Sequence, residues 1–226
     1  MRSSHRIEKE QFEELVSIAR SRKLPVVISY DSEDAICPSE RRWDLPSLIK
    51  TVPEFITYKL TNRIRMNVEL SSFINSVMNC IKFHHRSSYP SVSLAFAEDE
   101  ETARRILANY MHEGYVFISN GALKNVSKGD EPYKDESHKT EFCESDGEIH
   151  ATAATCLEFE NVVMVIDSNY YYNEEGYLVS KYREGGQYLV RHLFHGMNRA
   201  KYKLAVVVLE NEEVFEELLN IVQGKG

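Results

Sequence analysis

Cationic side chains that suit phosphate binding stand next to two segments that the sequence predicts as strands. Arg63 and Arg65 follow the apolar end of one segment, and Arg199 directly precedes the apolar run KLAVVVL. Guanidinium groups form paired, charge-assisted hydrogen bonds to phosphate oxygens. Strand ends are also where ligands meet α/β sheets. Two such arginines would hold a phosphate from outside, in the manner of an arginine finger.

The loops that would cradle a phosphate from inside are absent from the sequence. There is no G-x-x-x-x-G-K-[ST] string, and none of the ten glycines belongs to a G-x-G-x-x-G string. The nucleophile motif G-x-S-x-G is missing as well. We therefore expect no nucleotide hydrolysis by this chain unaided, and the sequence disfavours hydride transfer and hydrolysis by a serine triad.

Histidines raise the question of a metal site. His192 and His195 are three residues apart on an expected helix, where both side chains reach one face, and His150 or Cys156 would be further ligands. No second ligand pair has a recognisable spacing, whereas histidines without a ligand role are common on helices. We therefore predict no metal site.

The overall composition limits the kinds of partner that the protein can bind. The net charge of −8 opposes non-specific capture by nucleic acid or anionic membrane, so a strand of DNA or RNA would need a local basic patch. The four cysteines form no C-x-x-C pair, and no apolar run of about 18 residues occurs. We expect a cytoplasmic protein without a membrane partner.

Apolar periodicity predicts alternating strands and helices, and therefore a mainly parallel sheet with helices on both faces. The polar stretch at 124–147 is expected to be a surface loop, and the tyrosine-rich stretch NYYYNEEGYL an excursion. Expected helices span 8–22, 68–83, 99–112, 186–198 and 212–222, and expected strands span 26–30, 56–60, 91–97, 115–119, 161–167 and 203–209.

Three segments, taken in order, resemble motifs IV, V and VI of superfamily 1 DNA/RNA helicases. YKLTNRIRMN matches motif IV, ATCLEFENVVMVID matches the second half of motif V, and LFHGMNRAKYKLAVVV matches motif VI. The narrowest likeness is to the bacterial Schlafen-like DNA/RNA helicase group. It implies a three-layer RecA-like fold and a truncated helicase motor.

The resemblance assigns roles to matched residues. It makes Arg199 the candidate arginine finger and Arg65 a candidate γ-phosphate contact. Glu158, Asn62 and Asn198 become candidate cofactor-binding residues. Glu158 would contact ribose or nucleotide, Asn62 falls on a position of motif IV, and Asn198 stands in place of the usual threonine of motif VI.

The segments that resemble motifs III and V contain the candidate nucleic-acid or coupling residues. They also contain the positions at which this sequence departs from the family pattern. LPVVISYDSED resembles motif III through Asp31, whereas Asp34 stands where the family has glutamine. In motif V, Thr152, Thr155 and Cys156 replace the family's histidine, glutamine and glycine. These changes remove a flexible backbone position and polar side chains near the nucleic acid and the phosphate.

The sequence contains no counterpart of the family's first motor domain, because the phosphate loop and its acidic partner motif are both absent. It implies that residues 1–45 are the tail of a first domain and residues 46–226 the second RecA-like domain. ATP with Mg²⁺ would be held only with a partner chain that carries the missing motifs, and single-stranded DNA or RNA is the expected track. The alternative is a catalytically dead helicase-like module that binds a protein or a nucleic acid.

Overall fold

The computed structural model describes residues 9–29, 45–58, 67–82, 88–120, 148–151, 154, 157–182 and 186–224. Within these residues helices and strands alternate, as the sequence predicts. In chain order the elements are α1 (Lys9–Arg22), α2 (Leu45–Lys50), α3 (Val68–Met78), β1 (Val92–Ala97), α4 (Glu100–His112), β2 (Val116–Ser119), β3 (Glu148–His150), β4 (Phe159–Ile166), β5 (Tyr170–Tyr172), β6 (Leu178–Ser180), α5 (Gly186–Met197), β7 (Ala200–Leu209) and α6 (Glu212–Gln223).

In the described part of the chain, five strands form the main sheet in the order β1-β7-β4-β2-β3, and every neighbouring pair is parallel. The fold class expected from the sequence, a mainly parallel α/β sheet, is therefore confirmed. β5 and β6 make a separate antiparallel pair within the tyrosine-rich excursion. β3 was not expected, because three residues are too few to show a strand pattern.

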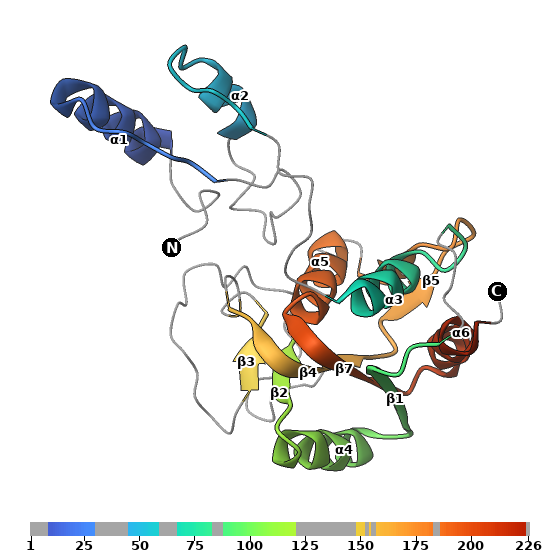
Figure 1. Cartoon of the computed structure of the whole chain (residues 1–226). Coiled ribbons are helices and arrows are strands. Elements are labelled where there is room, and N and C mark those ends of the chain that lie inside the picture. The colour runs from blue at the N-terminus through green and yellow to red at the C-terminus, as the bar shows by residue number, and fades with distance from the viewer. Residues whose placement is uncertain are drawn as a thin grey trace.

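The sheet has helices on both faces, as Figure 1 shows. Leu204, Val206 and Val208 of β7 pack in the cluster that lies under α3, α5 and α6. Ala205 and Val207 pack on the other face with α4. Because successive side chains of a strand point to opposite faces, residues 204–209 of β7 form a continuous apolar run, which is typical of a parallel strand buried on both sides.

Side-chain caps fix where the sheet's helices begin. Asp99 accepts a hydrogen bond from the Thr102 amide at the start of α4, and Asn67 accepts one from the Glu69 amide at the start of α3. The cap expected at Asn211 is confirmed, since its side chain accepts from the Val214 amide. Each cap satisfies a backbone donor that has no partner within its helix.

Two expected strands are wrong in the part that the structure describes. Residues 26–29 and 56–58 belong to no strand, and Val27, Ile56 and Tyr58 are 93%, 75% and 80% exposed. An apolar β-branched run suits a buried strand, but pairing needs a neighbour, and no described strand lies against either segment.

Some element boundaries also differ from the expected ones. α3 ends at Met78 rather than at residue 83, because Asn79 is extended and its side chain accepts hydrogen bonds from the Ile81 and Lys82 amides. β7 begins at Ala200, three residues before its expected start.

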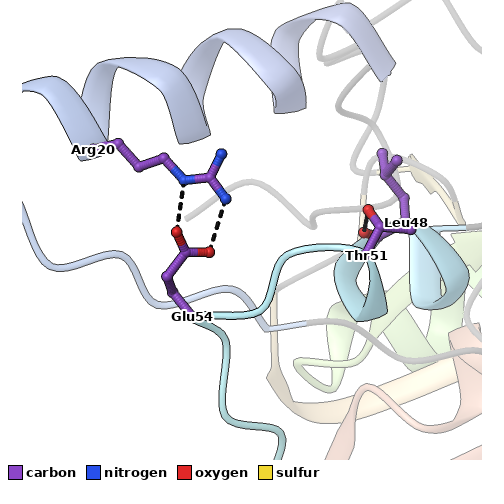
Figure 2. Close-up of polar contacts among 4 residues, drawn as sticks. All are labelled: Arg20, Leu48, Thr51 and Glu54. Carbon is purple, nitrogen blue, oxygen red and sulfur yellow. Dashed lines mark hydrogen bonds and ion pairs between the residues drawn. The ribbon is translucent and has the colours of Figure 1, made fainter.

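α1 and α2 pack on each other around a small core of their own. Phe12, Val16 and Ile49 are its buried side chains. Arg20 of α1 donates two hydrogen bonds, of 3.0 and 2.7 Å, to Glu54 after α2 (Figure 2). The proposed division of the chain at residue 45 stays a prediction, and the expected surface loop at 124–147 lies outside the described residues.

Candidate functional site

The last turn of α5 and the first residue of β7 position Arg199. Its amide donates to the Gly196 carbonyl at 3.0 Å, and its carbonyl accepts from the Phe159 amide at 2.9 Å. Gly196 allows α5 to lie close to the sheet, since a Cβ there would overlap the thioether of Met164 and lie 3.2 Å from Ile118 Cγ2. The backbone of Arg199 is therefore tied to α5 on one side and to β4 on the other.

The side chains of Asn198 and Arg199 bond back to the end of α5. Asn198 Nδ2 donates to the Phe194 carbonyl at 2.6 Å, and Arg199 Nε donates to the His195 carbonyl at 3.2 Å. Terminal carbonyls of a helix lack partners within it, and a cation is favoured at this negative end. The guanidinium forms no ion pair with a residue that the structure describes, so its charge is compensated there only by the helix end.

An ion pair between Glu158 and Lys201 links the start of β4 to the start of β7. Glu158 immediately precedes β4, and its Oε2 lies 3.0 Å from Lys201 Nζ on β7. The side chains are 30% and 41% exposed, so solvent weakens their attraction. Sequence reasoning did not assign Lys201 a partner, because Glu158 and Lys201 are adjacent only through the pairing of β4 with β7.

The register of β4 and β7 shifts beside this contact. Phe159 pairs with Ala200, whereas Asn161 pairs with Lys203, so β7 holds one residue more than β4 across the interval. A bulge of this kind breaks the alternation of side chains. Consistent with it, Tyr202 and Lys203 are consecutive and both exposed.

The candidate surface lies at the amino ends of β4 and β7. It unites three of the eight residues assigned from the sequence, namely Glu158, Asn198 and Arg199. The general rule places ligands at the carboxyl ends of parallel strands, so the strand-end argument alone pointed to the wrong edge. The remaining five, Arg65, Asn62, Asp31, Asp34 and Thr155, lie outside the described residues.

Among the described residues, the two helix-face histidines join no metal cluster. His192 is 2% exposed and packs inside the α5 layer, while His195 is partly buried at the same helix face. No group of three or more histidine, cysteine, aspartate or glutamate side chains suited to a metal gathers in the described part of the chain.

A buried polar cluster that sequence reasoning missed lies at the opposite edge, after β2 and β4. Asn120 Nδ2 donates to the Val165 carbonyl and to the Tyr170 hydroxyl, each at 3.1 Å. Asn211 Nδ2 donates to the carbonyls of Asp167 and Tyr170, each at 2.9 Å. The only sequence signal was Asn211 as a helix cap. These bonds anchor the β5–β6 pair to the main sheet.

Burial changes the acid chemistry of that cluster. Desolvation raises the pKa of the Asp167 carboxyl above its ordinary value, although hydrogen bonds from the Asn169 amide and side chain oppose the change. Desolvation also raises the pKa of the Tyr170 hydroxyl. Tyr170 therefore stays neutral at physiological pH and serves as a hydrogen-bonding link.

Comparison with solved structures finds a distant similarity. The chain is similar to the C-terminal domain of a possible DNA helicase from Lactobacillus plantarum WCFS1, with a TM-score of 0.35 and 14% sequence identity over 71% of this chain and 94% of that one. No protein-family model matches the sequence, and no curated protein matches it. None of these comparisons supports the narrower likeness to the Schlafen-like group.

No described helix combines the length and the apolar character that crossing a membrane requires.

Proposed function

We propose that this chain supplies the second RecA-like domain of a superfamily 1 DNA/RNA helicase motor. In this role it presents Arg199 to a nucleotide held by a first motor domain on another chain. It has no phosphate loop, so it contributes to hydrolysis only within that assembly.

One juxtaposition carries the proposal: the motif V-like and motif VI-like segments meet at adjoining strand ends. The Phe159 amide bonds to the Arg199 carbonyl, and Glu158 pairs with Lys201. Two stretches selected from the sequence for the same ligand thus share one surface. A guanidinium and a carboxylate there suit a phosphate and a ribose hydroxyl, respectively.

The described residues could contact a nucleotide from one side only and could not enclose its phosphates. ATP with Mg²⁺ would bring the phosphoryl bond to be broken, whereas the candidate residues that the structure describes offer one guanidinium, that of Arg199, and one carboxylate, that of Glu158. Arg199 can stabilise charge that develops on a transferred phosphoryl group, because its terminal amino groups remain available after Nε has bonded to His195. No metal-binding carboxylate cluster occurs in the described residues, so the metal would belong to the partner.

A catalytically dead interaction module is the second candidate. It is favoured by the engagement of Glu158 with Lys201, which occupies the carboxylate that a ribose would need. The replacement of the motif V glycine by Cys156 favours it as well.

The deciding experiment is ATP hydrolysis in the presence of single-stranded DNA or RNA. This chain is assayed alone and with a phosphate-loop-bearing first motor domain from the same genome, produced separately. Turnover that exceeds the sum of the two separate chains supports the split motor. Equal rates with and without this chain would favour the interaction module.

A further inference from the structure

The antiparallel pair β5–β6 forms a hairpin beside α3 and α6 (Figure 1), with one buried and one exposed face. Tyr172 and Leu178 lie opposite each other and point inward. The Tyr172 hydroxyl donates to the Val77 carbonyl of α3 at 3.0 Å, and Leu178 is 3% exposed. Because successive side chains of a strand point to opposite sides, the neighbouring pair, Tyr171 and Val179, points outward. We call the side that carries this second pair the outer face of the hairpin.

Aromatic and apolar side chains occupy the middle of the outer face. Tyr171 is 38% exposed, and Tyr177, two residues before Val179 and on the same side, is 41% exposed. Side chains that are directly or diagonally opposite in a hairpin are close enough to pack, so these three are neighbours. Ile81 adds to them near the turn: it is 70% exposed, and a Cβ at Gly176 would lie 2.7 Å from its Cγ1. Tyrosine is enriched at protein interfaces, because its ring buries apolar area while its hydroxyl keeps a polar partner.

The outer face carries opposite charges at its two ends. Glu174 and Glu175 are exposed at the turn. Lys181 is exposed at the other end, two residues after Val179 and therefore on the same side, and its amide hydrogen bond continues the pairing register of the hairpin. Lys82 also lies near the turn, but the two glutamates outnumber it. The described charges therefore make the turn acidic, and the opposite end presents a cation.

A face with this arrangement is complementary to itself. When two copies meet about a two-fold axis through the middle of the outer face, their hairpins run in opposite directions. The acidic turn of each copy then meets the Lys181 end of the other, and the tyrosines of both copies cover one apolar patch. Two-fold contacts use the same surface on both copies, so they require a surface that is complementary to itself. Complementary charges fix the register of such a contact and suppress other pairings.

We propose that the outer face of the β5–β6 hairpin binds a second copy of this chain in an antiparallel, two-fold arrangement. So few residues form a small interface, and interfaces below about 1,200 Å² in total are typical of weak, transient association. Single-stranded nucleic acid suits the face less well, because the glutamates at the turn repel phosphates. The hairpin is anchored at the sheet edge opposite Arg199, so the contact leaves the candidate site open and does not depend on the proposed function.

The test is sedimentation equilibrium of the full chain between about 1 µM and about 1 mM. We expect the average mass to rise with concentration from 26.2 kDa towards twice that value. Lys181→Glu makes both ends of the face acidic, and Glu174→Lys combined with Glu175→Lys makes both ends basic. Each of these two variants should raise the dimer dissociation constant at least about tenfold, because like charges then face each other. An equimolar mixture of the two should associate as the unaltered chain does, since each acidic end of one variant then meets a basic end of the other.

Tyr177→Ser removes a ring from the middle of the outer face and should weaken association as well. Its matched control is Tyr202→Ser, since Tyr202 is an exposed tyrosine, 62% accessible, on β7 at the other edge of the sheet. The control should associate as the unaltered chain does. A chain that stays monomeric up to about 1 mM overturns the proposal. A dimer that neither charge variant weakens overturns it too, as does a mixture of the charge variants that does not recover association. Recovery in the mixture cannot come from misfolded variants, so it separates the contact from a loss of structure.

Discussion

Glu158, which immediately precedes β4, and Lys201 on the neighbouring parallel strand β7 form an ion pair of 3.0 Å beside the backbone of Arg199. The pair ties the start of β4 to the start of β7 at the surface where the candidate nucleotide contacts gather. Because both side chains are partly exposed, its contribution to stability is small, and its larger effect is to fix the carboxylate.

A double-mutant cycle with Glu158→Gln and Lys201→Met would measure that contribution. We expect a coupling free energy of about 0.2–1 kcal/mol that decreases as salt is raised from low ionic strength. Urea unfolding of the four proteins provides the measurement. A coupling that is independent of salt would contradict an electrostatic origin.

Replacing Arg199 with alanine separates catalysis from folding. In the mixture with a first motor domain, Arg199→Ala should lower turnover by about a thousandfold or more, as for loss of an arginine finger. Loss of the bond to His195 should cost only about 0.5–1.5 kcal/mol of stability. Lys203→Ala, which removes an exposed cation from the same end of β7, is the matched control for charge. Full turnover by Arg199→Ala would reject the assignment.

Gly196 sets the approach of α5 to β4. A Gly196→Val side chain would overlap the buried Met164 thioether, so α5 must shift or Met164 must repack. We expect a loss of about 1–3 kcal/mol, typical of overpacking. Gln187→Val on the exposed face of α5 controls for helix propensity and should cost much less. Equal urea midpoints for the two variants would contradict the close approach.

The buried Asp167 should make stability fall as pH rises. Its folded-state pKa is raised, so its contribution is fully present below the ordinary value of 3.8 and is lost as pH rises through the folded-state pKa. Asp167→Asn removes this loss. The difference in urea midpoint between variant and wild type should therefore grow from pH 4 towards neutrality in the variant's favour.

Asp99 provides the opposite control. Hydrogen bonds from Thr102 lower the pKa of its carboxyl, so its stabilisation is present above the ordinary value and is lost as pH falls through the lowered pKa. Asp99→Asn should be the less stable protein at neutral pH, and its deficit should shrink in acid. The same sign for both variants would refute the burial argument for Asp167.

Much of the sheet follows from the sequence, because β4 and β7 are apolar runs long enough to be buried on both faces. Local capping chemistry likewise located the start of α6 at Asn211. Residues 26–29 carry an equally good strand pattern, yet no described strand pairs with them. The composition of a segment shows that it is suited to a β-strand. Whether it joins a sheet depends on residues far away in the sequence that must provide a neighbouring strand.

The candidate site was less accessible to sequence reasoning. Arg199 could be selected only through its resemblance to a helicase motif, since an arginine before a strand is by itself usually a solvated charge. The neighbour relation of Glu158 and Lys201 depends on the register of two parallel strands, which no local pattern encodes. The polar cluster around Asn120 and Asp167 was missed for the same reason.

The position of β7 between β1 and β4 affects how the protein is made. β1 pairs with residues that follow it by about 110 positions, so β7, which joins β1 to β4, is synthesised after both of its neighbours. Until β7 is made, β1 lacks the described strand that pairs with it, and one edge of β4 is open to wrong partners. Folding is therefore expected to be slow, because the contacts between β1 and β7 join residues that are far apart in the sequence.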